Sequence, residues 1–164
     1  MNDLDHLFVF SLDAQPFALP LAAVERVVRS VEVTPLPRMP QVILGVINLQ
    51  GRIIPVINLR KLFGLEAADA PPELELSDYL IIVHGAQRTM ALLVSAVSGV
   101  MRCADGEVAA AEAVLPRMEC IAGVVKREDA IVAVCDPDAL VSVIGERFLE
   151  AAMPVEEATE AGAP

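Results

Sequence analysis

The chain has 164 residues, its hydrophobic fraction is 55% and its mean hydropathy is +0.55. Twelve Lys and Arg stand against 23 Asp and Glu, and the formal net charge of −11 repels phosphate backbones and anionic lipid head groups. Aromatic residues make up 4% of the chain, so side chains on which bases stack are scarce. Composition therefore argues against nucleic acid as a partner, and the length allows one ordinary domain or two very small ones.

Membrane insertion and secretion are not expected either. The longest stretches without a charged residue, 39–51 and 89–101, have thirteen residues each, whereas a membrane-spanning helix needs about 20. The first residues, MNDLDHLFVF, carry acids where a signal peptide carries bases. The three cysteines form no C-x-x-C motif and their number is odd, as expected of reduced thiols. These features predict a cytoplasmic protein without direct membrane insertion.

Short runs of β-branched and other apolar residues, bounded by Gly, Pro and Asp, predict a mainly β protein. A tight turn at Gln50-Gly51 joins two of these runs into a hairpin. Because Pro55 cannot donate a ladder hydrogen bond, the second strand of this hairpin should lie at a sheet edge or carry a bulge there. The predicted strands are Leu7–Leu12, Phe17–Leu19, Val24–Val33, Val46–Leu49, Ile53–Ile57, Tyr79–His84, Met90–Val94, Val97–Cys103, Ile121–Lys126 and Ala130–Val134.

Helix is scarce in the sequence. Asp136-Pro137 supplies an N-cap and a first-turn proline for a helix over about 136–150, whose apolar residues are Leu140, Val143, Ile144 and Phe148. Asn58 should cap a shorter helix in NLRKLFGL. The acidic, proline-bearing stretch 66–77 reads as a linker, and 151–164 reads as a disordered tail.

The chain repeats itself in three places that keep their order, at separations of about 72 to 79 residues. The matches are AQPFALPLAAVERVVR with AQRTMALLVSAVSGVMR, LPRM with a second LPRM, and GVINLQGRIIPVINLRKL with GVVKREDAIVAVCDPDAL. The repeat predicts a duplicated β unit, with a first small barrel at about 7–65 and a second at about 78–135. Because units this small are marginal alone, they should pack together and leave a groove between them.

Nothing in the sequence points to a reaction. His84 and His6 have no third partner at metal-ligand spacing, so no metal site is predicted. A nucleophilic pair of Cys103 with His84 would require the fold to unite them, and no nucleophile elbow, P-loop or dinucleotide fingerprint supports an enzyme. No catalytic residue and no cofactor are therefore expected.

The stretch PLPRMPQVILGVINLQGRIIPVINLRKLFGL, together with the duplication, resembles the bacterial chemotaxis coupling protein family, CheW. The resemblance extends over about Leu7 to Leu149. It implies a mainly β fold of two SH3-like five-stranded β-barrels packed side by side, with a short helix after each and a C-terminal helix. It also implies a non-catalytic scaffold that links the cytoplasmic tips of chemoreceptors to the regulatory domain of a CheA-type histidine kinase.

The same resemblance implies a set of partner-binding residues. The groove between the barrels would be lined by three valines, and its rim would carry the glycine and the turn of the first hairpin. The simpler alternative is that these valines are ordinary core residues and that these glycines only meet the backbone needs of turns. The expected partner-binding residues are Val24, Arg26, Gly45, Gln50, Gly51, Arg52, Val97 and Val100.

Two of these positions depart from the family pattern. Gln50 stands where the family usually has Arg, and Arg26 stands where Glu is common, while Arg52 and Glu25 carry those charges one or two residues away. A guanidinium replaced by an amide loses a carboxylate clamp worth about 1.5 to 3 kcal/mol. We therefore expect a divergent paralogue with its own receptor and kinase set, for example one for pili or surface behaviour. A module that binds the kinase outside receptor arrays, and an enzyme or small-ligand carrier, are the alternatives.

Overall fold

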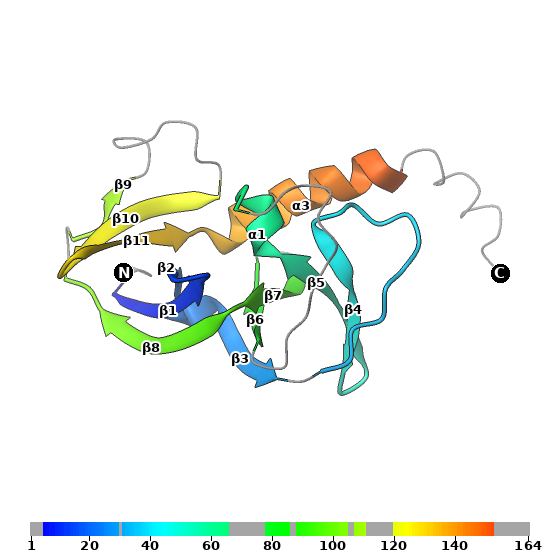
Figure 1. Ribbon diagram of the computed structural model, residues 1–164, viewed down its shortest axis with the longest axis horizontal. Helices are drawn as coiled ribbons and strands as arrows, with labels where there is room; N and C mark the ends of the chain where they lie inside the picture. The colour runs from blue at the N-terminus through cyan, green and yellow to red at the C-terminus, as the bar shows by residue number, and fades with distance from the viewer. Residues whose placement is uncertain are drawn as a thin grey trace.

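The structure is a computed structural model that describes residues 5–29, 31–65, 78–85, 88–104, 107–110 and 120–152. Its elements run in chain order as Figure 1 shows. They are β1 (His6–Leu12), β2 (Gln15–Pro20), η1 (Leu21–Ala23), β3 (Val24–Arg29), β4 (Ile43–Leu49), β5 (Arg52–Asn58), α1 (Leu59–Leu62), β6 (Tyr79–His84), β7 (Thr89–Val94), β8 (Ala96–Arg102), β9 (Ala109–Ala110), β10 (Ile121–Arg127), β11 (Ala130–Cys135) and α3 (Pro137–Ala152).

All the predicted strands are present, and most have bounds within one or two residues of the expected ones. The third predicted strand is shorter than expected: β3 ends at Arg29, and Thr34 forms only an isolated bridge to Val46. The two-residue strand β9 was not predicted because it is too short to show a period. The helix α3 extends to Ala152, two residues into the tail expected at 151–164. The expected linker 66–77, the second LPRM and the rest of the expected tail lie outside the described residues.

The strands form two sheets. Sheet A has six strands in the order β8-β1-β2-β11-β10-β9, and sheet B has five in the order β3-β6-β7-β5-β4. Among the described residues neither ladder closes on itself, so each sheet is an open counterpart of the expected barrel. The fold is mainly β, as predicted.

The sheets do not follow the two stretches, 7–65 and 78–135, that the repeat suggested as separate barrels. The hairpin β1–β2 pairs with β8 and β11 of the second half, whereas β3, β4 and β5 of the first half form sheet B with β6 and β7. The halves therefore exchange their first two strands. Because both copies carry the same apolar pattern, a strand pairs as well with the other copy as with its own.

The duplication itself is confirmed by the ladders. If β1 to β5 are matched with β6, β7, β8, β10 and β11, the first five strands of sheet A follow the strand order of sheet B. The registers agree as well, because Val24 pairs with Val83 and its counterpart Val97 pairs with Phe10. Both ladders also shift register at the same place, just after these two valines.

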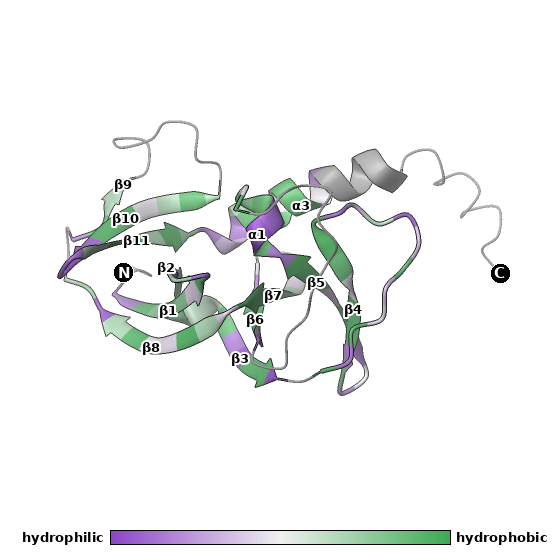
Figure 2. Ribbon diagram, viewed as in Figure 1, coloured by the Kyte–Doolittle hydropathy of each residue, from purple (hydrophilic) through white to green (hydrophobic). Residues whose placement is uncertain are grey.

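Within the residues that the structure describes, the core consists of three apolar clusters. One lies within sheet A, one lies within sheet B, and the largest draws buried side chains from both sheets and from α3. Phe10 of sheet A and Leu92 of sheet B are both 0% exposed in this shared cluster, and Figure 2 shows hydrophobic residues along the strands of both sheets. Each sheet thus buries one face internally and the other against its partner, so the two units pack together as expected.

The structure corrects the expectation for Pro55. The strand β5 lies between β7 and β4, so it is not an edge strand, and the register shift in this hairpin falls in β4 between Ile43 and Gly45. The proline is tolerated because β7 pairs with β5 only from Val56 onward. Pro55 therefore precedes the first residue of β5 that pairs with β7, and the parallel ladder loses no hydrogen bond to the proline.

Both predicted helix caps are present. Asp136 Oδ1 accepts hydrogen bonds from the backbone N–H groups of Asp138 at 3.0 Å and Ala139 at 3.4 Å. Asn58 Oδ1 accepts from the N–H of Lys61 at 3.4 Å. In the described residues α1 follows the β4–β5 hairpin and α3 follows the β10–β11 hairpin, so the expected second short helix and the C-terminal helix are a single element, α3. None of the helices in this part of the chain is long and apolar enough to cross a bilayer.

Two glycines with opposite surroundings test this account of the fold. A Cβ at Gly45 would lie 2.3 Å from the carbonyl oxygen of Thr34, whereas a Cβ at Gly145 would meet nothing within 4 Å. We expect Gly45→Ala to lower the free energy of unfolding by about 2 to 3 kcal/mol, because the backbone of Thr34 must move. Gly145→Ala should raise it by about 1 kcal/mol, because alanine favours helix.

Urea denaturation followed by circular dichroism measures both changes. A Gly45→Ala protein that unfolds at the same urea concentration as the unaltered protein would contradict the close approach of Thr34 to β4.

Candidate partner-binding surface

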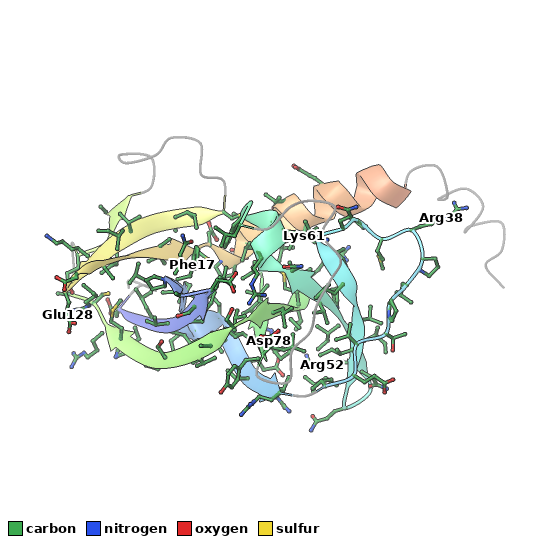
Figure 3. All side chains as sticks on the ribbon, in the orientation of Figure 1. Phe17, Arg38, Arg52, Lys61, Asp78 and Glu128 are labelled. Carbon is green, nitrogen blue, oxygen red and sulfur yellow. The ribbon has the colours of Figure 1, made fainter. Side chains whose placement is uncertain are left out.

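The turn between β4 and β5 forms an exposed tip. Gln50 and Gly51 both have positive φ, at 54° and 87°, as a two-residue type I′ hairpin turn requires. Leu49 and Arg52 face each other across the ladder, and Asn48 Oδ1 accepts a hydrogen bond from the N–H of Gly51 at 2.9 Å. The predicted hairpin is confirmed, and the side chain of Arg52 projects from the lower part of sheet B in Figure 3.

A glutamate joins this tip to two other strands. Glu25 Oε2 lies 2.5 Å from Arg52 Nη2, and Glu25 Oε1 lies 3.1 Å from His84 Nε2, a close contact that is not aligned as a hydrogen bond. The Glu25 side chain is only 21% exposed. The carboxylate therefore joins the hairpin tip to β3 through Arg52, and the two displaced charges that the sequence singled out form one ion pair.

Arg26 and Gln50 stand apart from this ion pair. Arg26 Nε is 3.8 Å from Glu25 Oε2, a longer contact than that of Arg52, and its side chain is 41% exposed. Gln50 is exposed at the turn. The ion pair that joins β3 to the hairpin tip is therefore formed by Glu25 and Arg52, and not by Arg26 or Gln50.

The three predicted groove valines differ in exposure. Val24 and Val97 are partly buried against the shared cluster, whereas Val100 is 55% exposed. Val97 pairs with Phe10 and Val100 pairs with Phe8, so the register shift places both valines on one face of β8. Val100 therefore offers an exposed apolar side chain on the same face of β8 as Val97, which packs against the shared cluster.

Gly45 has a backbone role. Its nearest neighbour is the carbonyl oxygen of Thr34, and the N–H of Thr34 donates to Val46 O at 2.8 Å across the same bridge. The counterpart Gly123 approaches the carbonyl oxygen of Ala109 in the same way. A part for Gly45 in partner binding stays a prediction.

Sequence reasoning missed two residues of this surface. Ile53, next to Arg52, is 64% exposed, and His84 contacts the Glu25 carboxylate. A signal for Ile53 was present, since two successive apolar residues in a strand point to opposite faces, and Ile54 is buried. The contact of His84 had no sequence signal, because β3 and β6 are paired only in the folded chain.

The described residues bring no reactive group to this surface. Cys103 is buried with the cluster inside sheet A, whereas His84 lies beside Glu25 and Thr89, so the two do not pair. Burial raises the pKa of the Cys135 thiol, and Cys120 and Asp136 raise it further, which keeps this sulfur protonated and weakly nucleophilic. No group of three metal-ligating side chains occurs in the described part of the chain.

Two packed β sheets with an exposed apolar and charged hairpin tip are typical of a domain that binds other proteins. The CheW-like domain family matches residues 6–145, and the chain therefore belongs to this family.

Named relatives agree with the family match. The chain is 32% identical to the chemotaxis protein CheW of Thermotoga maritima over 98 residues, which are 60% of this chain and 62% of that protein. It is 29% identical to the chemotaxis protein CheW of Rhizobium meliloti, over 62% of this chain and 63% of that protein. The match thus spans somewhat less than two thirds of the length of these two relatives.

A solved structure agrees over a longer stretch. The scaffolding protein CheW from Thermoanaerobacter tengcongensis superposes with a TM-score of 0.71 at 29% identity, covering 80% of this chain and 88% of that chain. These proteins are named for chemotaxis and scaffolding, and none is named for a reaction.

The ion pair between Glu25 and Arg52 can be measured with a double-mutant cycle. Because their side chains are 21% and 46% exposed, we expect Glu25→Gln and Arg52→Gln to show a coupling free energy of about 0.5 to 1 kcal/mol in urea unfolding. The matched cycle with Arg26→Gln should give a smaller coupling, because its contact is longer. Equal couplings would show that the hairpin tip is not held by this pair.

Proposed function

We propose that the chain is a non-enzymatic adaptor that couples methyl-accepting chemoreceptors to a CheA-type histidine kinase in chemotaxis-like signalling. The observation that carries the proposal is the hairpin tip, where Ile53 is 64% exposed beside an arginine fixed by Glu25. The family match and the names of the relatives support the same role. The adaptor is cytoplasmic and is recruited to receptor arrays at the membrane.

The hairpin tip binds the regulatory domain of the kinase. An exposed isoleucine can act as an apolar anchor, and a neighbouring charge whose direction is fixed can select the partner. Arg52 is such a charge, because Glu25 of another strand holds it. Gln50, an amide where the family usually has a guanidinium, gives this chain a preference for its own kinase.

The cytoplasmic tip of a chemoreceptor binds along the valines of β3 and β8. A receptor tip is helical and can place apolar side chains at helical spacing into such a groove. Val24 and Val97 form its partly buried floor, and Val100 offers an exposed side chain. Contacts of this kind are modest in area and gain strength when many of them form in one array.

Removal of the apolar anchor tests the kinase contact. We expect Ile53→Gln to weaken binding to the kinase regulatory domain at least about tenfold, measured by isothermal titration calorimetry. The control is Leu36→Gln, which alters a side chain that is 40% exposed on the segment before β4 and should leave the affinity unchanged. Equal affinities for both variants would remove the hairpin tip from the interface.

Co-sedimentation with receptor-containing membranes and kinase then separates the coupling role from its alternative. Assembly of all three components supports coupling. Kinase binding without recruitment to receptors would instead identify a sequestering module that acts outside receptor arrays.

Partner preference is tested at the turn. We expect Gln50→Arg to raise affinity for a kinase from a standard chemotaxis set at least about tenfold, because a guanidinium forms a charge-assisted clamp with a carboxylate. Pull-downs of the unaltered chain should recover its own kinase more strongly than the standard one. Equal recovery of both kinases, with no effect of Gln50→Arg, would refute a divergent partner set.

A further inference from the structure

A cleft of about 400 Å³ opens where α3 begins, between the two sheets. Its walls come from η1, the end of β6, the start of β10 and the end of β11. We call it the α3 cleft. Its lining residues include Ala22, Gly85, Ala122 and Cys135, and the polar side chains His84, Asp136 and Asp138. Ala22 and Ala122 keep this part of the cleft open, whereas the space beside Gly85 is taken by Val141, whose Cγ2 would lie 2.4 Å from a Cβ there.

The internal duplication supplies a counterpart for this cleft in the other half of the molecule. The strand pairings show which residues of the two halves are equivalent. Phe10 is equivalent to Val83 because they pair with the equivalent residues Val97 and Val24, and Val56 is equivalent to Val134 because they pair with Ala91 and Ala18. Four wall residues of the α3 cleft are smaller than their counterparts, whereas His84 is larger than its counterpart Ser11. The pairs are Ala22 with Ser95, Gly85 with Leu12, Ala122 with Leu44 and Cys135 with Ile57.

The counterpart position is filled by an arginine. Arg60, the first-turn residue of α1, corresponds to Asp138 of α3. Its Nε lies 3.0 Å from Asp13 Oδ2, its Nη2 donates to Ser95 Oγ, and its side chain is only 12% exposed. The N–H of Asp13 also donates to Ser95 Oγ at 3.1 Å. The guanidinium of Arg60 thus fills the position beside α1 that is equivalent to the α3 cleft.

The α3 cleft carries two carboxylates, Asp136 and Asp138, together with His84, whose Nε2 lies 3.1 Å from the carboxylate of Glu25. Asp138 replaces Arg60, so the side chain that closes one half becomes a carboxylate in the other. Asp136 accepts from the N–H groups of Asp138 and Ala139, so these donors at the start of α3 are already engaged. An anion would find two carboxylates here, which disfavours it, whereas a cation is attracted.

We propose that the α3 cleft is a docking site for an arginine side chain from a partner protein, which occupies it as Arg60 occupies the equivalent place. The acceptors of Arg60, Asp13 and Ser95, are replaced by alanines at the equivalent positions 86 and 22, so the carboxylates of Asp136 and Asp138 must hold the guanidinium instead. Arginine fits better than lysine because its planar fork can donate to two carboxylates at once. η1 leads directly into Val24 of β3, so a partner lying along β3 reaches the cleft. The route along β3 rests on the receptor position proposed above, whereas the binding of a guanidinium in the cleft is tested without either partner.

Nuclear magnetic resonance tests the site with a small probe. Nα-acetyl-arginine N-methylamide is titrated into the ¹⁵N-labelled full chain, and the backbone amides of Ala22, Gly85 and Ala122 are followed. We expect these amides to shift and to saturate with a dissociation constant on the order of millimolar. The citrulline analogue, which has the same shape without the charge, should cause no such shift, and the lysine analogue should bind more weakly.

Variants then locate the site. Asp138→Asn should weaken probe binding about tenfold, whereas Asp129→Asn, on the turn at the far end of the β10–β11 hairpin, should leave it unchanged. Asp138→Arg combined with Ala22→Ser rebuilds the Arg60–Ser95 arrangement and should close the cleft to the probe. Circular dichroism and urea unfolding confirm that each variant is folded.

Four outcomes would overturn the proposal. The first is the absence of saturable shifts at the three amides, and the second is an equal response to the citrulline or lysine analogue. The third is unchanged binding by a folded Asp138→Asn protein. The fourth is a set of shifts at these amides that grows with protein concentration without probe, which would assign the cleft to a second copy of this chain.

Discussion

The apolar cluster shared by the two sheets is the constraint on which the rest of the structure depends. Each sheet is too small to fold stably around its own cluster, and the face that it turns to its partner carries fully buried side chains such as Phe10 and Leu92. The exchange of β1–β2 joins the two halves of the sequence as well, because separation of the halves would break the ladders to β8 and β11 within sheet A. The relative position of every surface element follows from that fixed junction.

The two halves of the molecule share one backbone arrangement. They carry residues with the same role wherever the backbone geometry requires a particular residue. Gly45 and Gly123 both approach a facing carbonyl oxygen, and Asn58 and Asp136 both cap the helix that follows. A substitution at such positions disturbs strand pairing or helix initiation in either half, which is why the two copies keep the same solution.

The halves differ where side chains meet solvent or a partner. Arg52 has no charged counterpart, since Ala130 holds that position on the other hairpin, and Arg60 is matched by Asp138. A repeated fold thus carries two unlike surfaces, one with a fixed arginine at its tip and one with an open acidic cleft. Unlike surfaces on one rigid frame allow a small protein to hold different partners in a set geometry.

The sequence by itself determined the strands, the Gln50-Gly51 turn, both helix caps and the duplication, because these depend on residues close together in the chain. The tertiary structure alone decided which copy each strand pairs with, since both copies show the same apolar pattern. It also decided that Pro55 lies in an inner strand and that Glu25 holds Arg52. Those outcomes depend on contacts between distant segments, whose energies no local pattern records.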